Sequence, residues 1–275
     1  MKLQRLGIRF LSVLFPNWVA RYAFHYITHP QKKFVRKEEA AFLNSAKQQA
    51  YPFKGKNVQT YTWEGKGPGV LCVHGWEGHS GNFKAIIAAL QEQGLRVHAF
   101  DAPAHGASSA NTTNLFEISS LVAKMLLYFK TPYIVSHSFG GVATCHALAQ
   151  NPSIAIKKYL LFTVPDKFTE RIDYVFELLG AKAKSKRILI ETIESTLNVT
   201  IAEMEVSRYV SKINVDKALI IHDVSDRVIP ITQAERVVAQ WPKAKLEKIS
   251  GTGHFKVLLN PEVIAKGISF LCGEK

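Results

Sequence analysis

The sequence predicts an α/β protein in which helices flank a mostly parallel central sheet, with a helical cap inserted. Short apolar runs of the kind that form buried strands alternate with helical patterns of about ten to fifteen residues, and such alternation indicates βαβ units. Polar side chains also follow the predicted strands, and open parallel sheets bind ligands at the carboxyl ends of their strands. These side chains are His74, Asp101, Ser138, Asp223, Asp226 and His254.

Composition places the 275-residue chain among folded proteins with a sizeable core, because 47% of its residues are hydrophobic and 21% are charged. Its formal charge of +13 suits nucleic acid or an anionic membrane surface, but no nucleic-acid-binding motif is present. We therefore expect a basic, solvated exterior and no nucleic-acid partner. The three cysteines, Cys72, Cys145 and Cys272, lack paired spacing and predict buried free thiols in a reducing compartment, so we expect a cytoplasmic location.

The first 28 residues predict a basic amphipathic segment. Four apolar residues fall on one face of a helix and basic residues fall beside them, until Pro16 breaks the pattern; the apolar four are Leu3, Leu6, Phe10 and Leu14. The uncharged run is too short for a signal peptide or a membrane-spanning helix. Two interpretations stay open. In one the helix packs on the domain, and in the other it rests on lipid at the inner face of a membrane.

The remaining elements follow in order along the chain. Strands are expected at 58–63, 70–73, 97–100, 133–135, 159–162, from 218 onward and at 246–249, and helices at 83–93, 115–129, 142–150, 232–240 and 261–271. Asn114 is placed to cap the helix over 115–129, with Glu117 three residues later.

One long helical stretch interrupts the alternation. Residues 166–213 carry two helical apolar stripes, one of Leu189, Ile193 and Leu197 and the other of Val206, Tyr209, Val210 and Ile213. A helical insertion after a sheet strand predicts a cap, or lid. We therefore expect a helical amino-terminal extension over 1–50, a core over 51–165 and 214–275, and a cap over 166–213.

Residues 133–141 predict a strand, a tight turn and a helix, with Ser138 at the turn. This arrangement is a nucleophile elbow, which lifts a serine hydroxyl out of the sheet. Small residues are needed two positions before and after the serine, because the strand and helix backbones pass close together. Gly140 meets this need, whereas Ser136 stands where glycine is usual.

Five motifs in order resemble the α/β-hydrolase superfamily, in its serine esterase and lipase-like branch, over residues 57–272. They are His-Gly at 74–75, Asp-x-Pro-x-His-Gly-x-Ser at 101–108, the elbow at 136–140, Asp-x-x-Ile-Pro at 226–230 and Gly-x-Gly-His at 251–254. Their order of nucleophile, acid and histidine is that of the superfamily. Ser136 and the basic amino-terminal extension are departures from its pattern.

The catalytic roles follow from this resemblance and from the chemistry of serine. A serine hydroxyl needs a base to take its proton, and that base needs a carboxylate to hold its tautomer. We expect Ser138 as the nucleophile, His254 as the base and Asp226 as the acid. Asp223 is the rival acid, three residues earlier.

Supporting residues are expected around this triad. The backbone N–H groups of Phe139 and Trp76 would form the oxyanion hole, and the Trp76 ring could also line an acyl pocket. His74 is expected to orient its loop, Asp101 to buttress the turn before His105, and His137 to point away from the substrate. His79, His105 and His222 lack metal-ligand spacing, so we expect structural roles, no metal and no cofactor.

The resemblance implies a carboxylesterase, a serine hydrolase that cleaves small-molecule acyl esters through an acyl-enzyme. Ser138 excludes the dehalogenase and epoxide-hydrolase branches, in which similar proteins carry aspartate at this position. A thioesterase or acyltransferase with the same triad is an open alternative. A non-catalytic binding protein is a second one, because a fold does not imply an activity.

Overall fold

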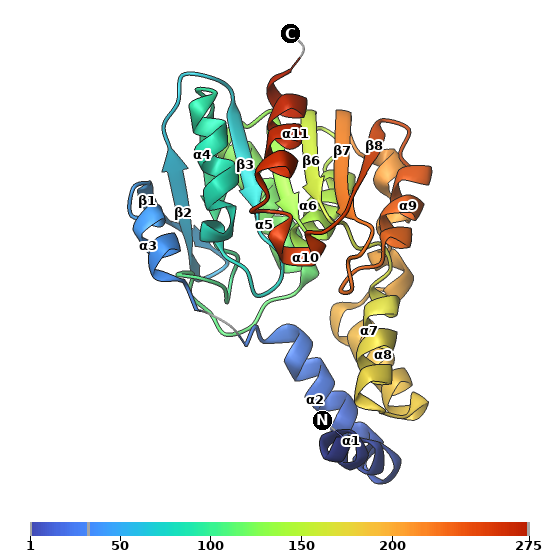
Figure 1. The fold of residues 1–275 in the computed structure, drawn as a ribbon. Coiled ribbons are helices and arrows are strands. Elements are labelled where there is room, and N and C mark those ends of the chain that lie inside the picture. The colour runs from blue at the N-terminus through green and yellow to red at the C-terminus, as the bar shows by residue number, and fades with distance from the viewer. Residues whose placement is uncertain (1, 32–33, 274–275) are drawn as a thin grey trace. The chain divides into compact units, whose positions relative to one another are not determined.

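Eight strands form one sheet in the computed structural model, which describes residues 2–31 and 34–273. The strand order is β1-β2-β4-β3-β5-β6-β7-β8 (Figure 1). Strand β2 pairs antiparallel with both β1 and β4, and all other neighbouring strands are parallel. The strands are β1 Lys47–Phe53, β2 Lys56–Trp63, β3 Gly69–Val73, β4 Arg96–Phe100, β5 Tyr133–His137, β6 Ile156–Phe162, β7 Val215–Asp223 and β8 Ala244–Ile249. The predicted mostly parallel sheet is confirmed.

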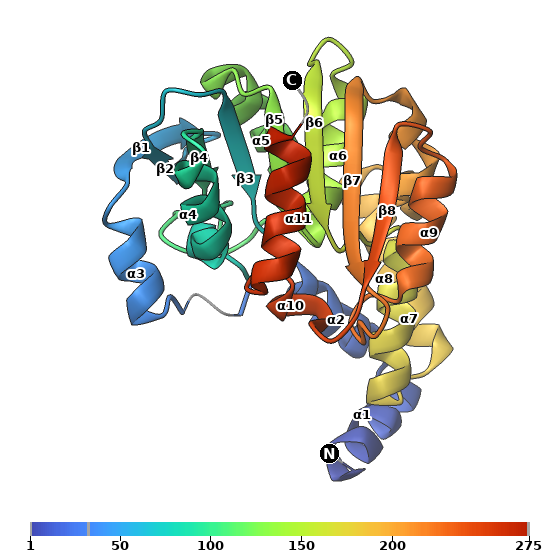
Figure 2. The same ribbon diagram turned by 45° about the horizontal axis from the view of Figure 1, so that its top comes forward.

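Helices cover both faces of this sheet. Two of them, α4 (Lys84–Glu92) and α11 (Pro261–Cys272), lie side by side on one face, and α5 (Leu115–Phe129) and α6 (Phe139–Gln150) cover the other (Figure 2). A further helix, α9 (Ile231–Ala239), packs beside β7 and β8. The Asn114 side chain accepts a hydrogen bond from the Glu117 N–H at 3.0 Å, as its capping position predicts.

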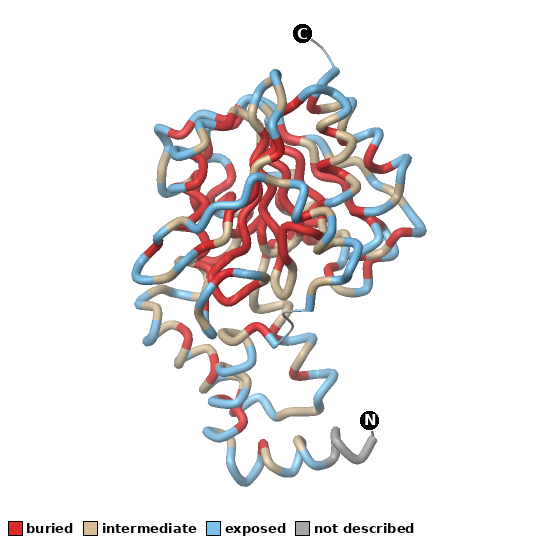
Figure 3. The backbone as a smooth tube through the Cα atoms, turned by 90° about the vertical axis from the view of Figure 1, so that its left-hand side faces the viewer, coloured by how far each residue is buried: buried red, intermediate tan, exposed pale blue. Residues whose placement is uncertain are grey.

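The core lies along the central strands, where most residues are buried (Figure 3). Strands β3, β5 and β6 are buried along most of their length because helices cover them on both faces. Cys72 and Cys145 are buried free thiols, as predicted, but Cys272 is exposed. That prediction was wrong because Cys272 lies in the last turn of α11, where its side of the helix faces solvent.

The sequence patterns did not locate two elements before β2, both of which begin within the helical extension expected over 1–50. Strand β1 is an edge strand whose residues 47–50 are all exposed, so it carries no alternation of apolar and polar side chains. Helix α3 (Lys37–Leu43) spans only seven residues and buries Leu43 alone. Short or edge elements bury too little surface to leave a periodic signal.

By its contacts the chain divides into two compact units, Met1–His29 with Lys167–Glu205, and Pro30–Asp166 with Val206–Lys275. The first unit contains α1 (Lys2–Leu14), α2 (Pro16–Thr28), α7 (Phe168–Leu179), α8 (Ala183–Leu197) and a short 3-10 turn, Ile201–Met204. Within it α2 packs along α8, and α1 contacts α2 and α7. Pro16 opens α2 at a position where its missing N–H costs nothing.

The second unit holds the sheet and both ends of the inserted segment. The Asp166 carbonyl accepts from the Val206 N–H at 3.2 Å, and its carboxylate accepts from the Ser207 N–H at 2.8 Å and pairs with Arg236 at 2.9 Å. The two chain ends of the insertion are therefore held together in the core. That residues 166–213 act as a lid stays a prediction.

The prediction of a helix over residues 206–213 is wrong. This stretch forms two 3-10 turns, Val206–Arg208 and Val210–Lys212. Hydrogen bonds between residues three apart, from the N–H of Tyr209 and of Lys212, close these turns and still bury Val206 and Val210. The apolar spacing thus predicted the buried side chains correctly and the backbone conformation incorrectly. Residues three or four apart lie on one side of both a 3-10 turn and an α-helix.

The amino-terminal stripe is described in part. Side chains of residues 2–6, including Leu3 and Leu6, lie outside the described residues. Phe10 and Leu14 of the same stripe are exposed. Among the residues that the structure describes, no helix has the length and apolar character needed to cross a bilayer.

Candidate active site

Ser138 occupies a strained turn between β5 and α6. Its backbone has φ +53° and ψ −125°, which a residue with a Cβ adopts only when its surroundings enforce it. The Ser138 N–H donates to the carbonyls of Phe162 and Thr163 at 3.0 and 2.9 Å, which fixes the turn to β6. At Gly140 an added Cβ would lie 2.4 Å from the carbonyl oxygens of Val73 and His74. A small residue is therefore required at Gly140, and the backbone that crowds it is the end of β3 rather than the preceding strand β5.

Ser136, the departure from glycine, is fully buried. Its Oγ lies 2.8 Å from the hydroxyl of Tyr159, which is also fully buried and lies 3.4 Å from the Gly141 carbonyl oxygen. The serine therefore places a hydrogen bond between β5 and β6 beneath the turn, where glycine would leave the tyrosine hydroxyl one partner fewer.

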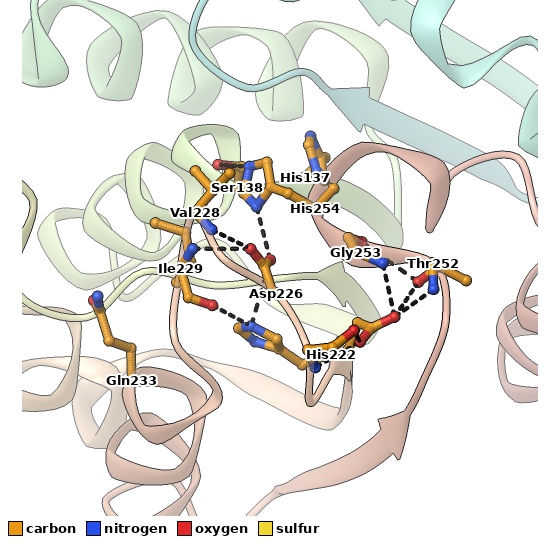
Figure 4. A network of polar contacts seen from close by, with 12 residues as sticks. His137, Ser138, His222, Asp226, Val228, Ile229, Gln233, Thr252, Gly253 and His254 are labelled. Carbon is orange, nitrogen blue, oxygen red and sulfur yellow. Dashed lines mark hydrogen bonds and ion pairs between the residues drawn. The ribbon is translucent and has the colours of Figure 1, made fainter. Parts of the chain in front are cut away.

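Ser138, His254 and Asp226 form one hydrogen-bonded chain (Figure 4). The Ser138 Oγ lies 3.1 Å from His254 Nε2, and His254 Nδ1 lies 2.8 Å from Asp226 Oδ2. An ionised carboxylate only accepts, so Nδ1 carries the proton and the Nε2 lone pair faces the serine hydroxyl. These side chains are the three that the sequence predicted, brought together from the ends of β5 and β7 and the start of α10 (Gly253–Lys256).

Asp226 is held as a charged acceptor. Its Oδ1 accepts from the N–H groups of Val228 and Ile229 at 2.7 and 2.9 Å, while Oδ2 accepts from His254. Burial favours a raised pKa for this carboxyl, but the hydrogen bonds from His254, Ile229 and Val228 outweigh it and hold the pKa below its ordinary value. Asp226 is therefore ionised at neutral pH and can accept the hydrogen bond from His254 Nδ1.

Asp223, the rival acid, has a different set of partners. Its Oδ2 accepts from the N–H and hydroxyl of Thr252 and from the N–H of Gly253, and its Oδ1 accepts from the N–H and hydroxyl of Ser225. Although burial favours a raised pKa, these hydrogen bonds bring the pKa of Asp223 well below its usual range. This carboxylate thus ties the loop that leads into His254 to the end of β7.

Two further histidines support this centre, and the sequence did not reveal their contacts. His137 donates from Nε2 to the His254 carbonyl at 2.9 Å, and burial lowers the pKa of His137 to about 3. His222 donates from Nε2 to the Ile229 carbonyl at 2.9 Å and lies 3.7 Å from Asp226 Oδ2. Burial also lowers the pKa of His222, so both rings are neutral and support the site through these hydrogen bonds. The partner of His137 lies 117 residues away, beyond any local pattern, whereas the contacts of His222 lie four and seven residues along the chain.

The loop after β3 lies against the elbow. A Cβ added to Gly75 would stand 3.2 Å from the Ser138 Cβ, and the Trp76 and Phe139 rings meet edge to face at 5.5 Å. His74 orients this loop as expected, with Nδ1 donating to the Gly75 carbonyl at 2.8 Å and Nε2 accepting from the Ala102 N–H at 2.9 Å. The two backbone segments expected to bind an oxyanion therefore both adjoin Ser138.

Asp101 joins the loops after β3 and β4. Its Oδ1 accepts from the Ser80 N–H and hydroxyl at 2.8 and 2.7 Å, and its Oδ2 accepts from the Tyr61 hydroxyl at 3.1 Å and the Ala107 N–H at 2.9 Å. It buttresses the turn around His105, as the sequence indicated, and also anchors the segment that follows Trp76.

Residues 68–176 match the family model described as alpha/beta hydrolase fold. This protein has the α/β-hydrolase fold. Among solved structures, the esterase Pf2001 of Pyrococcus furiosus aligns with a TM-score of 0.64 at 16% identity, over 90% of this chain and 97% of that one. Est1E of Butyrivibrio proteoclasticus, solved with ferulic acid, aligns with a TM-score of 0.63 at 20% identity, over 81% and 99% of the two chains. At these identities the likeness concerns the fold.

One distant relative of this chain is an esterase. The pimeloyl-(acyl-carrier protein) methyl ester esterase of Chromobacterium violaceum is 32% identical over 102 residues, which are 37% of this chain and 39% of that enzyme. The chain thus spans less than half of the length of that relative. Within the described residues, no cluster of three or more His, Cys, Asp or Glu side chains is arranged to hold a metal ion.

Proposed function

We propose that this α/β-hydrolase is a serine carboxylesterase that cleaves small-molecule esters through an acyl-enzyme. The observation that carries the proposal is the chain of hydrogen bonds from Ser138 through His254 to Asp226, with the serine half-buried on a strained turn. A serine hydroxyl within hydrogen-bond reach of a correctly oriented imidazole is what nucleophilic catalysis needs.

The reaction begins when His254 Nε2 takes the hydroxyl proton as Ser138 Oγ bonds to the ester carbonyl carbon. The carbonyl oxygen gains the negative charge, and the N–H groups of Phe139 and Trp76 would stabilise it. Asp226 stabilises the imidazolium, which then gives its proton to the departing alkoxide as the ester bond breaks. Water repeats the sequence on the acyl-enzyme, and the products are an alcohol and a carboxylic acid.

Ester substrates are supported by the surroundings of Ser138 and by the relatives. The Trp76 and Phe139 rings provide an apolar surface beside the nucleophile, suited to an acyl group. The Chromobacterium relative is an ester-cleaving enzyme by name. A thioesterase or acyltransferase would use the same side chains and differ in the leaving group or the acyl acceptor.

Labelling with a fluorophosphonate probe tests the proposal, because such probes bond covalently to activated serines. We expect the wild type and a Ser136→Gly control to label and Ser138→Ala to remain unlabelled. Equal labelling of Ser138→Ala would overturn the assignment of the nucleophile. Hydrolysis of p-nitrophenyl esters from acetate to palmitate, compared with matching thioesters, then separates esterase from thioesterase activity and defines the acyl length.

A further inference from the structure

Helix α2 has two unlike sides. One side carries Val19 and Ala20, which are buried within the first unit, where α2 packs along α8. An adjacent stripe presents Trp18, Tyr22 and Tyr26, which are 56%, 59% and 50% exposed. These three residues stand four apart and so form one stripe, in which the Trp18 and Tyr22 rings stack at 5.6 Å.

The end of α1 and the junction with α2 expose further large apolar side chains. Phe10 is 64% exposed and Phe15 is 56% exposed. Together these residues make what we call the aromatic surface: Phe10, Val13, Leu14, Phe15, Trp18, Tyr22 and Tyr26. Single exposed apolar residues are ordinary, but seven within 17 consecutive residues signal a partner that covers them.

The charge of this segment specifies the kind of partner. Residues 1–37 contain no aspartate or glutamate, and the first 40 residues hold eight lysines and arginines against two glutamates. Arg9 and Arg21 are exposed on the same helices as the aromatic surface. The partner must therefore present an apolar layer beneath negative charge, which is the structure of an anionic lipid surface. Trp and Tyr favour the boundary between headgroups and acyl chains in such a surface.

We propose that the aromatic surface docks this protein on anionic phospholipid, with α1 and α2 lying in the plane of the interface. Each helix has 13 residues and so reaches about 20 Å, which is too short to cross a hydrocarbon core of about 30 Å. Arg9 and Arg21 would contact the headgroup phosphates while the aromatic rings enter the headgroup layer. The proposal does not depend on the chemistry of Ser138.

Flotation of the full-length protein with vesicles tests the proposal. We expect it to float with mixed phosphatidylglycerol and phosphatidylcholine vesicles and to remain unbound with phosphatidylcholine alone. Binding should weaken when ionic strength rises from about 0.01 M to about 0.15 M, because the Debye length falls from about 30 Å to about 8 Å.

Paired substitutions separate the aromatic and basic contributions. Trp18→Ser with Tyr22→Ser should weaken binding on the order of tenfold or more, since large apolar areas no longer enter the interface. Arg9→Gln and Arg21→Gln should weaken it about fivefold each. The matched control, Leu127→Ser with Tyr128→Ser, removes two exposed apolar side chains from α5 and should bind as the wild type does. Circular dichroism melts verify that each variant is folded.

Three outcomes would overturn the proposal. One is the absence of binding to anionic vesicles at low ionic strength, and another is equal loss of binding in the α5 control. The third is concentration-dependent dimerisation that Trp18→Ser with Tyr22→Ser abolishes, without binding to any vesicle. That result would make the aromatic surface an interface between copies of this chain.

Discussion

The Ser138 site buries polar groups, whereas the aromatic surface of α1 and α2 exposes apolar groups. At the site Asp223, Asp226 and His254 are nearly inaccessible to solvent, yet each has two or more hydrogen-bond partners. On the aromatic surface large rings such as Trp18 are more than half exposed. Burying a charge is costly unless hydrogen bonds satisfy it, and exposing apolar area is unfavourable unless a partner covers it.

The two regions also differ in whether the chain itself supplies all the groups that they contact. The site is complete within the second unit, because every group that orients its charges comes from that unit. The aromatic surface lacks its counterpart in the chain as described. Changes at the site should therefore alter activity and leave lipid binding intact, whereas changes on the aromatic surface should do the reverse.

The largest effect should come from Ser138→Ala. Removing the nucleophile of a triad lowers kcat on the order of 10⁶-fold, and we expect a loss of that order in p-nitrophenyl ester hydrolysis. Vesicle flotation of the same variant should match the wild type. Retention of near-full esterase activity would contradict the role of Ser138, and loss of flotation would contradict the independence of the two regions.

Asp226→Asn should have the next largest effect. The amide no longer stabilises the imidazolium and favours the wrong tautomer of His254, so kcat should fall by about 10⁴-fold with little change in KM. Asp223→Asn is the matched comparison, with the same chemical change three residues away. If it lowered kcat as much as Asp226→Asn does, the division of roles between the two aspartates would be wrong.

Asp223→Asn should mainly reduce stability and only modestly reduce activity. The amide weakens the charge-assisted hydrogen bonds to Ser225, Thr252 and Gly253, so the free energy of unfolding at pH 7 should fall by about 1–3 kcal/mol. Activity should fall by about tenfold as the His254 loop loosens. Urea titrations measure the first effect, and ester hydrolysis measures the second.

The pH dependence of this stability loss has a defined sign. Because the pKa of Asp223 is lowered on folding, its stabilisation is fully present above the unfolded pKa of about 4 and is lost as pH falls toward the folded pKa. The difference between wild type and Asp223→Asn should therefore be constant from pH 7 to about pH 5 and shrink below about pH 4. A difference that stays constant down to pH 3 would contradict this origin.

The smallest effect should come from Ser136→Gly. This change removes the hydrogen bond to the buried Tyr159 hydroxyl, so the free energy of unfolding should fall by about 1 kcal/mol while kcat changes little. Tyr159→Phe and the double variant complete a cycle, and a coupling of about 0.5–1.5 kcal/mol would show that the hydroxyls act as a pair. Additive effects would mean that Ser136 is merely a tolerated small residue.

Much of the fold was predictable because its signals are local. Continuous apolar runs marked β3, β5 and β6, and the Asn114 cap with its Glu117 partner marked the start of α5. The edge strand β1 and the 3-10 turns around Tyr209 were not predictable. The first buries little, and the second shares its apolar spacing with an α-helix.

Residue order alone was enough to nominate Ser138, Asp226 and His254, because a nucleophile elbow and the loops after parallel strands converge at one edge of a sheet. The sequence left Asp223 as a rival acid three residues earlier, and the tertiary structure places Asp226 against the imidazole of His254 and Asp223 against the Thr252 loop. It also set His137 against the His254 backbone and left Trp18 and Tyr22 facing outward. These outcomes depend on side-chain directions and on contacts between distant segments, whereas sequence patterns report only neighbours along the chain.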